Sequence, residues 1–282
     1  METAQTLHRQ LSASSPTTLL PLPSLTWLAT LIPSNTTRIP PLPSLLATAR
    51  LRLLSSDLST PGLLDPQWVA SHSFPACLTR AQGQQQVSRP GGEGREQILD
   101  RDVVVQVLDV ENLNRSKWEI VEDLESIERG EQTRGREVIR LPTAGSGNED
   151  DQLDMGDGGT QTQTAALAQN NTVSQQAAQA RERERKNATH KLVIQDASGQ
   201  RLFALELKRV DEIGVPLFVN GKMIGGTPIG GKILLKRGTK MARGVVLLEP
   251  GLVKVLGGRV EGWGKVWEGG RLERLRGEVQ RG

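Results

Sequence analysis

The chain contains no tyrosine and a single cysteine, Cys77, and aromatic residues make up only 3% of its 282 residues. The absence of tyrosine excludes every mechanism that uses a tyrosine nucleophile. One cysteine forms neither an internal disulfide nor a four-cysteine zinc site, and such usage is typical of an intracellular chain. No apolar run approaches the roughly 20 residues of a membrane-spanning helix, and the first ten residues do not predict a secretion signal.

Residues that carry catalysis are equally scarce. The three histidines, His8, His72 and His190, lie far apart in the sequence, so they do not predict a metal site or an acid–base pair. The glycine runs at 91–94 and 225–226 lack the Lys-Ser/Thr pair of a phosphate-binding loop and are typical of turns. We therefore predict no enzymatic activity, no catalytic residue, no cofactor and no metal.

Charge is distributed unevenly along the chain. Residues 111–157 carry 6 basic and 13 acidic side chains, a net charge of −7, whereas residues 186–282 carry 18 basic and 9 acidic side chains, a net charge of +9. The acidic middle repels nucleic acid, and the basic C-terminal third is able to attract it. A solvated surface on which charges happen to cluster is the alternative explanation.

The N-terminal region has short apolar stripes at helical spacing. Leu45, Ala49 and Leu53 follow Ser44, as Leu25, Leu28 and Ile32 follow Ser24, so both serines are predicted to be N-caps. Because single helices of this length are marginal in water, two or three helices are expected to pack together before Pro61. We predict a helical bundle over residues 1–75 and a Gln-, Gly- and Ser-rich linker over 76–98.

Five later segments have the composition and alternation of β-strands, with turn residues between them. They are residues 100–110, 192–195, 202–207, 231–235 and 245–248. Five strands are the number in an OB-fold, a small Greek-key barrel. The predicted fold class is therefore mainly β, with an OB-fold domain over residues 99–282.

A long insertion is predicted between the first two strands, over about residues 112–186. It begins with a helix, because Ser116 and Glu119 match a capping box and Ile120, Leu124 and Ile127 follow at helical spacing. A further strand is possible over 135–141, and residues 143–179 have too few bulky apolar side chains to order themselves. The tail over 260–279 is predicted to form one covering helix that its glycines weaken.

Several motifs of this sequence resemble the RecQ-mediated genome instability protein 1 family, and in particular its fungal-type members with a single OB-fold. The segments that carry the resemblance are Arg134–Arg140, His190–Asp196, Phe203–Lys208, Arg243–Pro250 and Val253–Gly258. The resemblance implies a nuclear scaffold that binds topoisomerase III. It also implies that, with a RecQ-type helicase, the chain promotes dissolution of double Holliday junctions and takes part in DNA repair, recombination and replication.

The resemblance also implies a partner contact at Lys232 and the neighbouring Ile233, because the family's docking surface includes a lysine at the start of this strand. Lys232 is expected to be exposed, so Lys232→Ala should weaken capture of the partner without changing the melting curve. An edge-strand lysine that only discourages aggregation is the alternative. Trp118 and Leu124 are further candidates for the partner surface, unless their helix packs on its own domain.

Direct binding of single-stranded DNA is the competing hypothesis, because OB-folds often combine a basic groove with aromatic platforms. The candidate basic residues are Lys236, Arg237, Lys240 and Arg243. Aromatic platforms are few: Phe203 is expected to pack in the core, and Phe218 is expected in a connecting loop. This shortage favours the interaction scaffold over the DNA-binding module.

Overall fold

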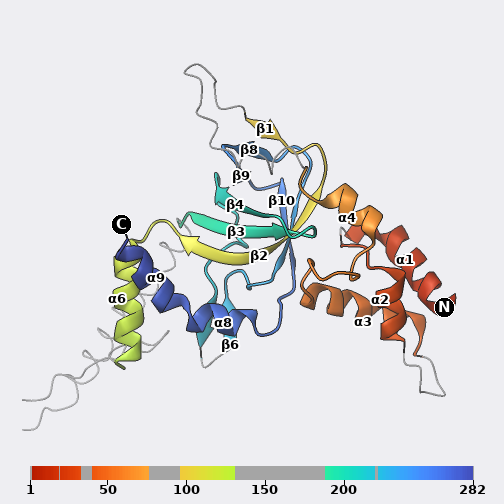
Figure 1. Ribbon diagram of the computed structural model, residues 1–282, viewed down its shortest axis with the longest axis horizontal. Helices are drawn as coiled ribbons and strands as arrows, with labels where there is room; N and C mark the ends of the chain where they lie inside the picture. Colours follow the sequence, from red (N-terminus) through yellow and green to blue (C-terminus); the bar gives the residue numbers. More distant parts are fainter. Residues whose placement is uncertain are drawn as a thin grey trace, which may run out of the picture.

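The computed structural model describes residues 2–18, 20–32, 40–75, 96–130, 188–219 and 222–281. A curled mixed sheet lies at the centre of the molecule, as Figure 1 shows. A helical unit, α1–α4, covers one side of the sheet, and α6 and α9 lie together beyond its other end (Figure 1). None of the helices in the described ranges combines the length and hydrophobicity that a membrane crossing requires.

The helical unit contains four helices among the described residues. They are α1 (Glu2–Thr18), α2 (Leu25–Leu31), α3 (Leu42–Ser55) and α4 (Pro66–His72). Ser24 caps α2, as predicted, because its hydroxyl accepts the Trp27 amide. The prediction that Ser44 caps a helix is wrong: the N-cap is Pro41, so α3 begins three residues earlier than predicted, at Leu42. Pro43 lies in the first turn of α3, where proline is tolerated.

The first helix, α1, was not predicted, because its apolar residues are sparse among Ser, Thr and Gln. It nevertheless buries Ala4, Leu7 and Leu11 against α2 and α3. The predicted apolar stripe of α3, Leu45, Ala49 and Leu53, is buried as expected. The fourth helix lies beyond Pro61, before which the two or three predicted helices were expected, but within the bundle predicted over residues 1–75. Its N-cap is Asp65, whose carboxylate accepts the Gln67 and Trp68 amides.

The main sheet has eight strands in the order β1-β8-β9-β4-β3-β2-β7-β10, and the β4–β9 pair is its parallel pair. Each of the five predicted segments overlaps one of these strands, with bounds that differ by up to three residues. The strands are β1 (Gln97–Ile98), β2 (Val103–Asn112), β3 (His190–Asp196), β4 (Arg201–Glu206), β7 (Lys232–Leu235), β8 (Lys240–Ala242), β9 (Val245–Leu248) and β10 (Val253–Gly257). A separate hairpin consists of β5 (Leu217–Val219) and β6 (Lys222–Gly225), so Phe218 lies in a strand rather than in the predicted loop.

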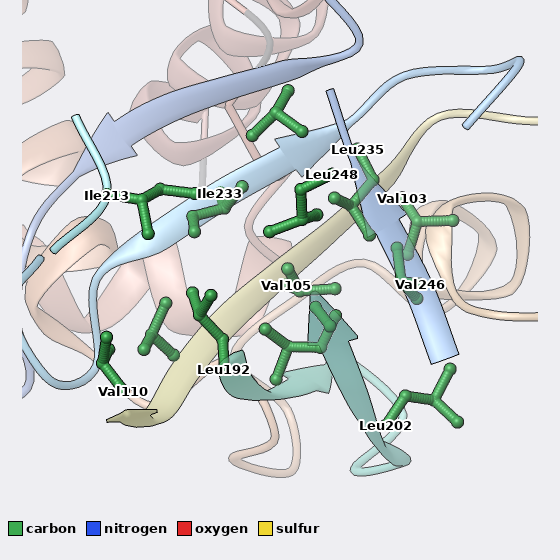
Figure 2. Packing of buried hydrophobic residues seen from close by; sticks show 14 of the residues in the cluster. Val103, Val105, Val110, Leu192, Leu202, Ile213, Ile233, Leu235, Val246 and Leu248 are labelled. Carbon is green, nitrogen blue, oxygen red and sulfur yellow. The ribbon is translucent and has the colours of Figure 1, made fainter. Parts of the chain in front are cut away.

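The concave side of the sheet holds the largest apolar core. Alternate residues of β2, β3, β4, β7 and β9 point into it, including Val105, Leu192, Leu202, Ile233 and Val246 (Figure 2). Complete burial of one such side chain contributes about 1.5–3 kcal/mol. Because the side-chain period of a strand is two, this packing fixes which residues of each strand face outward.

Between β2 and β3 lies α6 (Lys117–Glu128), which has the predicted capping box: the Ser116 hydroxyl accepts the Glu119 amide, and the Glu119 carboxylate accepts the Ser116 amide. The helix ends before Gly130, whose φ of 75° favours glycine. The expected strand at 135–141 and the segment 143–179 lie outside the described residues.

The C-terminal segment forms two helices rather than the one predicted. They are α8 (Trp263–Gly269) and α9 (Arg271–Val279). The break follows from the consecutive glycines Gly269 and Gly270, since glycine is unfavourable inside a helix. Helix α8 inserts Trp267 into the sheet core, where its indole donates to Asp109 at 2.5 Å.

Candidate interaction surface

The convex face of β3, β4 and β9 carries an apolar strip that the strand registers define. Phe203 pairs with Val193 of β3 and with Val245 of β9, and Leu205 pairs with Leu247. Residues in register share a face, and their neighbours Leu202, Ala204, Val246 and Leu248 are buried inside. The outer strip therefore consists of Val193, Phe203, Leu205, Val245 and Leu247.

Phe203 is 47% exposed at the centre of the outer strip, and the other four members are half-buried. The prediction that Phe203 packs in the core is therefore wrong. In β4, Leu202 and Ala204 are buried on the inner face, and Glu206 is buried on the same face, where it is bonded to His190 and Arg209. The prediction for Phe203 used only the general tendency of phenylalanine to be buried, and this tendency favours the inner face.

A cation lies over the exposed ring. The Lys191 ammonium is 5.4 Å from the Phe203 centroid, within the range of a cation–π contact, and it donates to Glu111 at 2.9 Å. Burial by itself raises the pKa of Glu111, but the ammonium groups of Lys191 and Lys117 outweigh it and hold that pKa below its ordinary value. Lys191 is thus held beside the aromatic ring at the edge of the outer strip.

Two of the four basic residues predicted to bind nucleic acid lie next to this strip, Lys240 on β8 and Arg243 in the turn between β8 and β9. Lys236 and Arg237 follow β7, which β2 separates from the strip. Arg237, Lys240 and Arg243 are exposed, and Lys236 is half-buried and donates to the Gly251 carbonyl at 2.7 Å. The backbone of Arg243, in the turn between β8 and β9, has a φ of 52°. Their positions are compatible with an electropositive border, and their role stays a prediction.

Lys232 and Ile233 are buried. Lys232 is 0% exposed and its ammonium donates to the Gly230 carbonyl at 2.6 Å, so the prediction of an exposed lysine at a strand edge is wrong. The physical reason is that β7 pairs on both sides, with β2 and β10, and the helical unit covers its convex face. Burial lowers the pKa of Lys232 to about 8, although the Asp57 carboxylate opposes this shift.

Helix α6 packs on its own chain and leaves one aromatic side chain exposed. Ile120 and Val121 are buried, Leu124 is half-buried, and Trp118 is 65% exposed. The contact with α9 includes a Lys117–Glu278 ion pair at 2.6 Å and an Arg276–Glu125 ion pair at 2.8 Å. The helix thus packs on its own chain, as the alternative expected, and the role of the exposed Trp118 at a partner surface stays a prediction.

The histidines are not assembled into one site. His190 contacts Glu206, His72 stacks on Trp68, and His8 lies 3.9 Å from Asp65. Within the described ranges, no three His, Cys, Asp or Glu side chains are grouped as metal ligands would be. The geometry of these residues thus supplies no positioned nucleophile–base pair of the kind that hydrolytic enzymes use.

The helices and the curled mixed sheet define an OB-fold domain preceded by an N-terminal helical domain, and comparison with known families agrees. A family model described as the RMI1 N-terminal OB-fold domain matches residues 75–271, and one described as the RMI1 N-terminal helical domain matches residues 17–61. The chain belongs to the RMI1 family, whose members include proteins named RecQ-mediated genome instability protein 1.

Two curated relatives carry that name. The chain is 29% identical to the protein of Schizosaccharomyces pombe over 184 residues, which cover 65% of this chain and 67% of the relative. It is 28% identical to the protein of Saccharomyces cerevisiae over 191 residues, which cover 65% of this chain and 70% of the relative. Their names support a role in genome stability connected with RecQ.

Proposed function

We propose that this chain is a non-catalytic, nuclear subunit of a complex between a RecQ-type helicase and topoisomerase III. In this proposal it binds topoisomerase III and promotes the dissolution of double Holliday junctions during DNA repair, recombination and replication. Membership of the RMI1 family supports the connection with RecQ. The scaffold role is supported by the absence of tyrosine, since the chain itself has no nucleophile for breaking DNA strands by the tyrosine mechanism.

The observation that carries the binding proposal is the outer strip. It is an apolar surface on a rigid sheet, it has an exposed phenylalanine at its centre, and charged residues border it. Protein interfaces have this organisation, with an aromatic anchor surrounded by a polar rim. Trp118 supplies a second exposed aromatic residue on α6.

The finer architecture of the domain belongs to the same proposal. Strands β2, β3, β4, β7 and β9 are taken as the five strands of the OB barrel, with β1, β8 and β10 as additions to them. The chain between Asn112 and His190 is then the insertion between the first and second barrel strands. Boundaries at residue 75 and residue 99 separate the helical bundle, the linker and the OB-fold domain.

Co-purification with topoisomerase III tests the proposal. Phe203→Asp places a charge at the centre of the outer strip, and loss of a central aromatic anchor is expected to weaken capture by at least about tenfold, or 1.4 kcal/mol. The matched control is Leu51→Asp, because Leu51 is 69% exposed on α3 of the helical unit and does not belong to the sheet. Equal capture by wild type and Phe203→Asp, with both folded, would refute docking on this face.

Single-strand DNA binding is the second candidate function, and the exposed Phe203 ring with Lys191 above it favours this candidate. Phe203→Leu separates the two, because leucine keeps the apolar surface but cannot stack on a base. A DNA-binding module should lose about 1–3 kcal/mol of single-strand affinity in this variant. A protein-docking face should retain most of its partner capture. Fluorescence anisotropy with an oligonucleotide and the co-purification assay measure the two outcomes.

A further inference from the structure

The contact between the helical unit and the OB-fold domain is formed largely by buried apolar residues. Leu53, Leu58, Leu63, Leu64 and Trp68 of the helical unit pack against Val104, Ala197 and Leu234 of the sheet. At one end of this contact the Phe74 amide donates to the Asp196 carboxylate at 2.9 Å. We call this contact the seam.

The centre of the seam is polar. Gln106 of β2 is 0% exposed, and its amide group donates to Asp57 at 2.6 Å and to Gln195 at 3.0 Å. Its carbonyl accepts the Leu58 amide at 3.0 Å. One glutamine thus joins two strands of the sheet to the connection between α3 and α4, and the good hydrogen bonds offset the cost of burying it.

Lys232 lies beside Gln106, because the two residues are partners in the β2–β7 register. Gly257 is its partner on β10 and has no side chain. The ammonium has three donors, and the hydrogen bond described for it goes to the Gly230 carbonyl. Asp57 attracts it from the helical unit without a direct ion pair in the described structure. A buried ammonium so weakly compensated destabilises the closed seam relative to a state in which water reaches it.

We propose that the helical unit opens and closes on the OB-fold domain, and that the buried Lys232 ammonium sets this equilibrium by destabilising the closed state. Opening hydrates Lys232 and breaks the hydrogen bonds of Leu58 and Phe74, while the core inside the sheet stays packed. This opening equilibrium does not depend on which partner the chain binds.

The sign of its pH dependence follows from the same geometry. In the closed state burial lowers the pKa of Lys232 to about 8, and in an open, hydrated state the pKa returns to its ordinary value of 10.5. The open state therefore binds the proton more tightly, so raising the pH from 7 to 9 favours closure by about tenfold. Of the seam's other polar groups, Gln106 and Gln195 are neutral, and Asp57 stays ionised because its pKa is lowered.

Hydrogen exchange on the full chain, read by mass spectrometry and corrected for intrinsic rates, tests the proposal. At pH 7 peptides containing the Leu58 or Phe74 amides should exchange faster than one containing Val107, whose amide donates to Gly231 within the sheet. Lys232→Met should slow exchange at Leu58 and Phe74 by at least about tenfold, since an apolar side chain of similar length removes the buried charge. Lys240→Met, on exposed Lys240, is the matched control and should change neither.

A second test uses the wild-type protein alone: the protection of the Leu58 amide against hydrogen exchange should rise about tenfold between pH 7 and pH 9. Identical protection at Leu58, Phe74 and Val107 would overturn the proposal, because the seam would then open only with the whole domain. Unchanged or faster exchange in a folded Lys232→Met variant would also overturn it. If that variant does not fold, the pH dependence of the wild-type protein decides alone, and a protection of Leu58 that does not change between pH 7 and pH 9 rejects the proposal.

Discussion

Glu206, at the end of β4, is the acceptor for four hydrogen bonds inside the protein. One carboxylate oxygen accepts the backbone amide and the Nδ1 of His190, both at 2.7 Å. The other oxygen accepts the Arg209 guanidinium at 2.8 Å and the Val210 amide at 3.0 Å. Burial raises the pKa of Glu206, but these hydrogen bonds outweigh it and lower the pKa below 4.5. We predict that Glu206→Gln destabilises the fold.

The magnitude follows from the donors that lose their acceptor. Glutamine offers one oxygen, so its NH₂ group faces two of the four donors, and Arg209 loses its countercharge. An unsatisfied buried donor costs about 1–3 kcal/mol, and breaking a buried ion pair costs about 3–5 kcal/mol. The Arg209 side chain is 25% exposed and also donates to the Val210 and Ile213 carbonyls, which softens the loss. The expected cost is therefore about 2–4 kcal/mol.

Urea unfolding at pH 7, followed by circular dichroism, measures this cost. Glu111→Gln is the matched control, because the Glu111 carboxylate pairs with Lys191 and Lys117 near the surface, and its removal should cost less than about 1 kcal/mol. The folded pKa of Glu206 is lowered, so its contribution is present above the unfolded pKa and is lost as the pH falls through the folded value. The difference between wild type and Glu206→Gln should shrink below about pH 4.

A loss below about 1 kcal/mol at pH 7, equal to that of Glu111→Gln, would refute this reasoning. It would mean that water or a rearranged Arg209 replaces the carboxylate at little cost. A difference that stays constant down to pH 3 would refute the assignment of the effect to the Glu206 charge.

Two further predictions concern the seam and the acidic middle of the chain. Gly258→Ala should destabilise the protein by about 2 kcal/mol or more beyond the effect of Gly257→Ala. Both glycines have a positive φ, but only a Cβ at Gly258 would clash with the Leu54 carbonyl of α3. Equal shifts of the melting temperature in the two variants would contradict this prediction. Deletion of residues 145–179 should leave a cooperative melt, since this segment has little apolar surface and loop length changes closure entropy slowly; a loss of several kcal/mol would contradict that expectation.

Local patterns of the sequence determined much of the secondary structure. The capping box of Ser116 and Glu119, the Ser24 cap and the buried stripe of α3 were all readable, because a cap or a helical face involves residues only three or four positions apart. The five segments of alternating residues likewise contain strands of the sheet. Family membership was also readable, since it depends on short motifs that the chain itself carries.

The tertiary structure alone decided which polar side chains are buried. Glu206 and Lys232 are buried although charged residues are mostly exposed, Phe203 lies on the outer face, and the expectation that Lys232 is exposed was wrong. The groups around them come from distant parts of the sequence: His190 lies 16 residues from Glu206, and Gln106, the register partner of Lys232, bonds Asp57 at a separation of 49 residues. A charged group is buried only where other elements bring hydrogen-bond partners to it, and residue spacing within one strand holds no information about those elements.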